Sequence, residues 1–417
     1  MHRRINPRPT FRANGAPSRL FAALTLTTAV ALALACDGQD AAPPDTGASA
    51  ADTAAGANAA ASGPADSEKT AAAAASAESG PTAILDCVPK DNARPICKFV
   101  SPEDMVPLPG NEAILISGYG SARKPGGLVL FPLADETPRT LYAGGSDADK
   151  AEAGWGDPAC TSPPKDKFNA HGIDLVRRSD GRLALLVVQH FGREAIEFFE
   201  VTGSGTDWNV AWKGCVLAPP DASLNEVVGL PNGDFYTTKM ASISGASDFT
   251  QAIPTEPTGY AFAWTAKDGY RKIEGTDGVM PNGIAASPDG KTLYLDVTMQ
   301  SEVRKIDVAT GKLLGSASVK MPDNVTWAPD GKRLLVASLH GFETTSFGVC
   351  VDVQAGACPI PFAIQAVDAE TMTALGPVYE STGAPMGGGT VGLQVGDELF
   401  IGSFTGDRIL RVALAKP

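Results

Sequence analysis

The stretch SPDGKTLYLDV, residues 287–297, joins a tight turn directly to a run of strand-forming residues. Asp-Gly supplies the positive-φ conformation that a tight hairpin turn requires, and the apolar run after it is typical of a β-strand. The same pattern returns 41 residues later as APDGKRLLVAS, residues 328–338. The chain therefore contains a repeated unit made of one turn and the strand that follows it.

Four further segments show the same unit: PGNEAILISGYG (109–120), SDGRLALLVVQH (179–190), PNGDFYTTKM (231–240) and VGDELFIGSF (395–404). The starts of successive units lie 41 to 70 residues apart, which leaves room for four short strands and their loops. Six such units with almost no helical periodicity predict an all-β fold, a six-bladed β-propeller. A β-sandwich with long loops would explain the strands but not six similar units. A propeller has its site at one end of the central channel, where the innermost strands begin.

The first 82 residues differ in character from the rest. Residues 1–36 are predicted to be a signal peptide, because five arginines precede the apolar run 20–35 and Cys36 follows as a candidate lipidated residue. Ordinary signal cleavage without lipidation is the alternative. Residues 37–82 are rich in Ala, Gly, Ser and Asp and predict a flexible tether. Residues 83–417 then form the propeller domain.

The charge balance limits the partners. Thirty-four Lys and Arg against 47 Asp and Glu give a formal net charge of −13, so a nucleic-acid partner is not expected. We expect an exported, periplasmic or cell-surface lipoprotein that meets the membrane only through its N-terminal lipid. We also expect a monomer whose partner is a small-molecule substrate.

Six cysteines remain besides Cys36, and none of them forms a CxxC pair or a zinc-binding spacing. In an oxidising compartment, disulfides are the expected state. The close spacings favour Cys87 with Cys97 and Cys350 with Cys358, which leaves Cys160 with Cys215 among fifteen pairings that six cysteines allow.

Acidic and amide residues stand just ahead of several turn-strand units, in SPEDMVPLP, SLNEVVGL, MPNGIAASPDG and MPDNVTWAPDG. Singly, Asn and Asp beside Gly or Pro are ordinary turn formers. At corresponding places in four blades, they predict oxygen atoms that converge in the channel. A hard oxygen set without thiolate or imidazole suits Ca²⁺ better than Mg²⁺, which accepts fewer protein ligands. A calcium site in the central tunnel is therefore predicted.

The segment FNAHGIDLVRRSDGRLALLVVQH contains His171 and His190, two of only four histidines. His171 opens one strand and His190 ends the next, so a hairpin across the turn at residues 179–181 brings both imidazoles to the same end. The alternative is that both are satisfied polar groups at a strand end. His340, in ASLHGF, lies at a similar strand end, whereas His2 belongs to the signal segment.

The order and spacing of these motifs resemble the paraoxonase/arylesterase family over residues 103–414. The resemblance is carried by the histidine segment, AIEFFEV, SLNEVVGL, MPNGIAASPDGKTLYL, MPDNVTWAPDG and GGTVGLQVGDELFIGSF. It implies a six-bladed propeller that hydrolyses lactones and aryl esters with two calcium ions in its tunnel. The implied ligands are Glu103, Asn225, Asn282, Asp323 and Asn324 for the catalytic calcium, and Asp104, the Ile173 carbonyl and Glu226 for the structural calcium.

Two positions depart from the family pattern. Glu226 stands where the family has Asp, which puts the second calcium in question. Val412 stands where the family has a disulfide cysteine, so the ring must close through strand pairing.

By the same resemblance, His171 and His190 match the active-site histidine pair. His171 would take a proton from the attacking water while His190 orients it or relays the proton, and Asp323 is the alternative base or nucleophile. Met280, His340 and Phe404 are candidates for an apolar substrate wall. The stretch 241–275, with Tyr260, and the segment 350–358 are candidate specificity loops.

Two other functions compete with this interpretation. One is a gluconolactonase-type enzyme, also six-bladed and metal-dependent, although sugar-lactonase sites usually lack the histidine pair. The other is a non-catalytic propeller that binds a ligand at its rim, since fold alone does not determine function.

Overall fold

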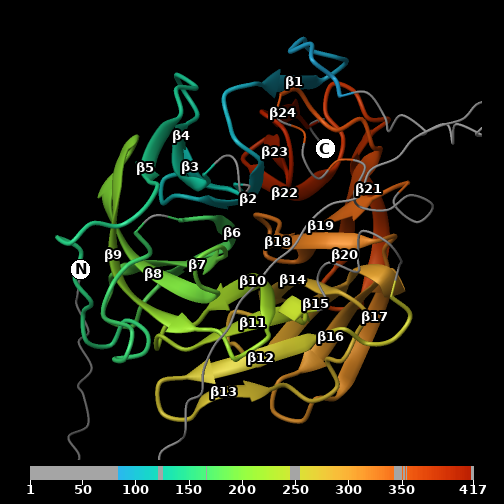
Figure 1. Cartoon of the computed structure of the whole chain (residues 1–417). Helices are drawn as coiled ribbons and strands as arrows, with labels where there is room; N and C mark the ends of the chain where they lie inside the picture. Colours follow the sequence, from blue (N-terminus) through green and yellow to red (C-terminus); the bar gives the residue numbers. More distant parts are fainter. Residues whose placement is uncertain are drawn as a thin grey trace, which may run out of the picture. The chain divides into compact units, whose positions relative to one another are not determined.

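The computed structural model describes residues 83–120, 125–165, 167–244, 254–341, 350, 353 and 355–414. Within these residues, the strands form six four-stranded antiparallel sheets arranged around one axis (Figure 1). The predicted six-bladed β-propeller is confirmed. The predicted signal peptide, Cys36 and the tether lie outside the described residues. In the described part of the chain, no helix is long and apolar enough to span a membrane.

Each of the first five sheets is one continuous piece of chain, numbered outward from the channel. Blade 1 is β2 (Pro102–Pro107), β3 (Ala113–Gly118), β4 (Gly127–Pro132) and β5 (Arg139–Tyr142); blade 2 is β6 (Ala170–Arg177), β7 (Leu183–Gln189), β8 (Ala195–Ser204) and β9 (Asp207–Leu217). Blade 3 is β10 (Ser223–Gly229), β11 (Phe235–Ala241), β12 (Tyr260–Thr265) and β13 (Gly269–Lys272); blade 4 is β14 (Pro281–Ala286), β15 (Thr292–Val297), β16 (Glu302–Asp307) and β17 (Leu313–Ser318), with the short 3₁₀ helix η2 (Thr298–Gln300) after β15. Blade 5 is β18 (Pro322–Trp327), β19 (Arg333–Leu339), β20 (Phe362–Asp368) and β21 (Thr373–Ser381).

Blade 6 joins the two ends of the ring. It consists of β22 (Gly389–Val395), β23 (Glu398–Ser403), β24 (Ile409–Ala413) and β1 (Ala93–Ile96). β1 pairs antiparallel with β24, and Ala93 lies opposite Val412. The position that lacks the family's cysteine is thus held by a strand ladder, as the sequence predicted.

The turn glycines of the repeated unit connect the innermost strand of each blade to the second strand. All six of them adopt a left-handed backbone, with φ between 61° and 96° (Gly110, Gly181, Gly233, Gly290, Gly331 and Gly396). Residues with a Cβ are strained in that region, so glycine at this position fixes where each hairpin reverses. This explains why the turn was the strongest repeat signal in the sequence.

The hydrophobic core is divided among the contacts between neighbouring blades. Among the described residues, six clusters of buried apolar side chains each join two adjacent sheets. The cluster that closes the ring joins Met105 and Ile116 of blade 1 to Val391 and Phe400 of blade 6. Neighbouring blades cover both faces of each sheet. The second strands, such as β3, β19 and β23, therefore carry buried side chains on both faces.

The three disulfides join the expected pairs, Cys87–Cys97, Cys160–Cys215 and Cys350–Cys358. One of the predicted specificity loops is corrected, because Tyr260 begins β12, an interior strand of blade 3. Its alternating apolar side chains reflect packing inside the blade rather than a loop at the tunnel mouth. Residues 245–253 of that stretch, and most of 342–354, lie outside the described residues.

Candidate active site

Every innermost strand has a register shift against its neighbour close to its beginning. The shifts fall at residues 102–105, 170–173, 224–227, 281–284, 322–325 and 389–391. A bulge leaves residues outside the ladder and re-aims their side chains. The side chains predicted from the sequence as ligands, together with His171, all stand at these shifts: Glu103, Asp104, Asn225, Glu226, Asn282, Asp323 and Asn324.

The amide oxygens of the three asparagines predicted as ligands lack any donor. Asn324 donates its NH₂ to Glu103 Oε1 at 2.8 Å, Asn225 directs its NH₂ at the sulfur of Met240, and Asn282 donates to Asp323. The Oδ1 atoms of these three asparagines and Oε2 of Glu103 are buried without a hydrogen-bond partner. Unpaired buried acceptors are costly, so they indicate a partner that is a cation or a donor.

The buried carboxyl groups near these amides raise one another's pKa. Burial raises the pKa of Glu103 well above its usual range, and the nearby Asp104 and Asp323 add to the effect. Burial likewise raises the pKa of Asp323 to about 7, and Asp104 adds to it. Mutual repulsion among buried carboxylates is relieved by a shared counter-cation.

The donor set fits Ca²⁺. It offers two carboxylates and three amide oxygens, and four of these five side chains have a buried oxygen with no other partner. Within the described residues, no group of three or more His, Cys, Asp and Glu side chains has the arrangement of a metal site. The fit therefore depends on the amide oxygens of Asn225, Asn282 and Asn324.

A second level lies further along the channel. Asp104 Oδ2 accepts a hydrogen bond from the amide of Ile173 at 2.8 Å, and Glu226 Oε1 accepts one from Val227 at 2.7 Å. Glu226 lies over Gly172, where an added Cβ would approach its Oε1 to 2.4 Å. The longer Glu thus fits because the residue beside it has no side chain.

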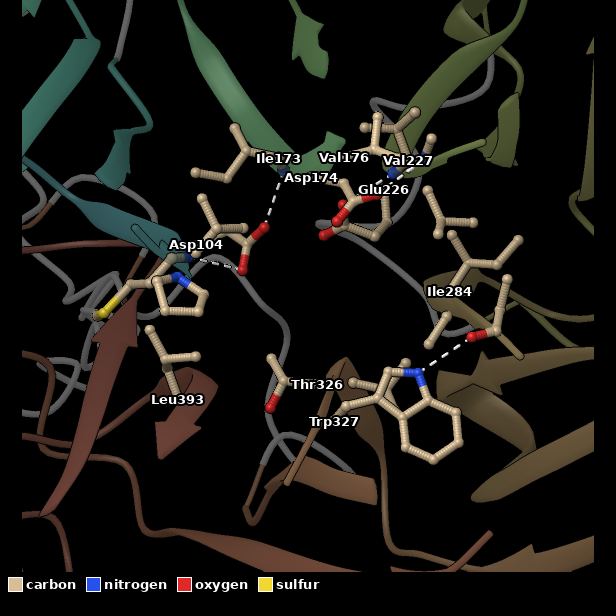
Figure 2. A pocket seen from close by; sticks show the side chains of 18 of the residues that line it. Asp104, Ile173, Asp174, Val176, Glu226, Val227, Ile284, Thr326, Trp327 and Leu393 are labelled. Carbon is tan, nitrogen blue, oxygen red and sulfur yellow. Dashed lines mark hydrogen bonds between the residues drawn. The ribbon is translucent and has the colours of Figure 1, made fainter. Parts of the chain in front are cut away.

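This second level opens into a cavity of about 690 Å³ at the turn end of the channel. Figure 2 shows Asp104, Asp174 and Glu226 directed into this cavity, with Trp327 and Leu393 across from them. Asp174 accepts a hydrogen bond from Gly229, and burial raises its pKa to about 6. The second predicted calcium site therefore has one more carboxyl beside it than the resemblance implied.

The two histidines are neighbours, as the hairpin argument predicted. Ala170 pairs with Gln189 across β6 and β7, and His171 Nδ1 lies 2.8 Å from His190 Nε2. His171 Nε2 is 3.7 Å from Glu103 Oε1, which places the pair beside the cation ligands. Burial lowers the pKa of His171 well below its usual range, so its imidazole is neutral at pH 7.

A cavity of about 400 Å³ lies against this pair, at the other end of the channel from the cavity in Figure 2. Its lining combines apolar and polar side chains: Phe191, Leu224, Met240 and Ile243, with Tyr119, Arg193, Glu194 and Ser223 beside the two histidines. The ring of Tyr119 packs against that of His171 at a tilt of 42°, with 4.6 Å between the ring centroids. Along β10, Leu224 faces the histidine cavity and Glu226 faces the other, so Asn225 stands between the two ends.

The three residues predicted to form a substrate wall make contacts away from the histidine cavity. Met280 is buried, and its backbone forms hydrogen bonds with Thr258 and Thr298. Nε2 of His340 lies 3.1 Å from the hydroxyl of Ser338. Phe404 packs against the hydrophobic core between blades 5 and 6. Of the described residues that line the histidine cavity, none is one of these three. Their role as a wall remains a prediction.

Four polar residues of the site region were missed by sequence reasoning. Tyr119 and Glu194 contact the histidine pair, Asp174 lines the cavity in Figure 2, and Asp296 in β15 is fully buried with both carboxylate oxygens unpaired. Asp296 does leave a signal in the sequence, since it is the one charged residue in the apolar strand TLYLDV. Burial and Asp323 raise its pKa well above the usual range.

The raised pKa values predict an unusual pH dependence for the calcium-free protein. Burial raises the pKa of Asp104 and of Asp323 from the usual 3.8 to about 7 in the fold, so the folded state holds more protons than the unfolded state. The free energy of unfolding should therefore fall as the pH rises from about 4 to about 7. Urea unfolding in EGTA across this range should show that fall, and saturating calcium should remove it. Identical pH profiles with and without calcium would contradict this assignment.

The middle of the chain is similar to a known protein family. Residues 176–337 match the SMP-30/Gluconolactonase/LRE-like region. This region runs from β6 to β19 and contains His190, Asn225, Asn282 and Asp323, whereas His171 and Glu103 precede it. This part of the chain is thus similar to the group that the gluconolactonase-type alternative belongs to.

No curated protein sequence matches the chain. Among solved structures, a luciferin-regenerating enzyme is similar at 15% identity and a TM-score of 0.48, with 76% of this chain and 92% of that chain covered. A gluconolactonase from Xanthomonas campestris is similar at 15% identity and a TM-score of 0.44, with 81% and 98% covered. Likenesses of this size carry no argument about function.

Proposed function

We propose that the protein is a calcium-dependent hydrolase of lactones and aryl esters, of the paraoxonase type. The observation that carries the proposal is the close approach of two groups of side chains in the channel. A bonded histidine pair lies 3.7 Å from Glu103, which belongs to the cluster of unpaired buried oxygen acceptors. A binding propeller would have no evident use for both groups.

Bound among these acceptors, Ca²⁺ would polarise the substrate carbonyl and stabilise negative charge on its oxygen. Glu103, Asn225, Asn282, Asp323 and Asn324 would hold it. His171, neutral and facing this cluster, would accept the proton of the attacking water, and His190 would take up or relay that proton.

The SMP-30/gluconolactonase/LRE-like match supports a lactonase-type hydrolase, and a sugar lactone is the second candidate substrate. The cavity beside the histidines favours the first candidate. Phe191 and Ile243 on its wall are 44% and 53% exposed, so they offer apolar surface to a ligand.

The N-terminal proposals are separate from the chemistry. We propose export of the chain and lipidation at Cys36, with the propeller acting as a monomer outside the cytoplasm. The three disulfides are compatible with export.

The deciding experiment measures hydrolysis of phenyl acetate, γ- and δ-lactones with alkyl substituents, and glucono-δ-lactone. The enzyme is the oxidised, calcium-loaded chain, with its fold checked by circular dichroism. We expect turnover of phenyl acetate and alkyl lactones, with kcat/KM well above that for the sugar lactone. Preference for glucono-δ-lactone would support the gluconolactonase alternative. No turnover of any substrate by folded protein would leave the ligand-binding propeller.

A further inference from the structure

Glu194 faces His190 across the turn between β7 and β8. Gln189 pairs with Ala195, and residues 190–194 form the turn between these two strands. Phe191 and Gly192 both adopt positive φ, 57° and 89°, which reverses the chain within two residues. The reversal brings the side chains at the two ends of the turn together.

Both carboxylate oxygens of Glu194 accept hydrogen bonds. Oε2 lies 2.8 Å from Nδ1 of His190, and Oε1 accepts the amide hydrogen of Leu224 at 2.6 Å. The side chain is 15% exposed, so water competes little for these bonds. Leu224 directly precedes Asn225 in β10, and Glu194 therefore connects the histidine pair to the strand that carries a predicted calcium ligand.

The carboxylate determines where the protons of both imidazoles lie. A carboxylate only accepts, so His190 must carry its proton on Nδ1 and leave Nε2 bare. The bare Nε2 can only accept from His171, 2.8 Å away, so His171 carries its proton on Nδ1. The remaining nitrogen, Nε2 of His171, then presents a lone pair on the side of Glu103.

We infer that Glu194 is a positioning residue: it fixes both histidine tautomers so that His171 Nε2 is the proton acceptor. Its catalytic consequence rests on the proposed function. When His171 Nε2 takes a proton from water, its Nδ1 proton passes to Nε2 of His190. The positive charge is then held on His190, next to the Glu194 carboxylate.

Glutamine cannot replace Glu194 in this role. Its single carbonyl oxygen can accept from Leu224, which turns the NH₂ toward His190 Nδ1 and forces the proton of His190 onto Nε2. The opposite rotamer sets the NH₂ against the Leu224 amide, donor against donor. The second arrangement breaks the bond to Leu224. The first keeps every bond but reverses both tautomers, so that a proton blocks His171 Nε2.

The test combines NMR with kinetics on the calcium-loaded protein. Only four histidines occur in the chain, so ¹⁵N-histidine labelling resolves the protonated nitrogen of each ring. We expect Nδ1–H on His171 and His190 in the wild type and Nε2–H on His190 in Glu194→Gln. The kcat for phenyl acetate should fall about 100-fold with KM little changed. Glu200→Gln is the matched control, because Glu200 is 19% exposed and bonds Arg182 and Lys213 instead.

The outcomes separate this inference from the proposed function. Unchanged tautomers in Glu194→Gln, or an unchanged kcat in an active enzyme, overturn the inference. A tautomer change in a protein that hydrolyses none of the substrates supports the positioning role and removes the proposed function. If Glu194→Gln does not fold, Glu194→Ala decides by the same spectra: retention of Nδ1–H on His190 overturns the inference, and its loss supports it.

Discussion

Chelation with EGTA should reduce ester and lactone hydrolysis to the background rate, and added calcium should restore it. The cation site depends on amide oxygens and carboxylates that have no other partner, so the empty site retains unpaired acceptors and repelling charges. A ligand at 100 times its dissociation constant stabilises the folded state by about 2.7 kcal/mol. The melting temperature should therefore rise with calcium concentration.

Titration calorimetry on the chelated protein should find two calcium sites, the weaker one at the level of Glu226. Magnesium is the control, because it favours fewer protein ligands and should restore little activity. Asn282→Ala should lower the affinity of one site only, whereas Asn209→Ala, on the outermost strand of blade 2, should change neither. Full activity and an unchanged melting temperature in EGTA would contradict a calcium role.

Replacing His171 with glutamine should lower kcat by a factor of about 10² to 10⁴, because the amide has no lone pair basic enough to take the proton of the attacking water. The stabilisation by calcium should remain, since His171 is not one of the proposed ligands. Kinetics and calcium-dependent melting measured on the same sample separate these two effects.

His340→Gln provides the comparison for this variant. Nε2 of His340 bonds Ser338, and His340 is a predicted substrate-wall residue rather than a predicted base, so its loss should change KM more than kcat. If His171→Gln keeps the wild-type kcat, Asp323, the alternative base or nucleophile, becomes the candidate.

The fold was predictable because its signal is local and repeated. Asp-Gly and Asn-Gly turns demand a left-handed residue, and each was followed by a strand that packs between two neighbouring sheets. The sequence predicted only that strand pairing must close the ring, because Val412 excludes a disulfide at its position. Its partner across the ladder, Ala93, could be identified only from the structure. Tyr260 misled, because a run of apolar aromatics is equally consistent with a loop wall and an interior strand.

The candidate site was predictable where its residues stand at equivalent places in several blades, as Asn225 and Asn282 do. Glu194 was not, because its contact with Leu224 crosses from one blade to the next and depends on a turn that only the structure shows. Asp296 was overlooked for a related reason. Its position in a second strand suggests a blade interior, and only the absence of donors around it marks it as unusual.

The sixth blade has a consequence for the order of folding. β1 and β24 are separated by most of the propeller in sequence, yet they pair in one sheet. Contacts of such long sequence separation form late and slowly. During synthesis the first five blades can build their sheets in turn, but the ring stays open, with the edges of β1 and β23 unpaired, until β24 has been made. A chain truncated before Ile409 should remain in that open state and aggregate through its exposed strand edges.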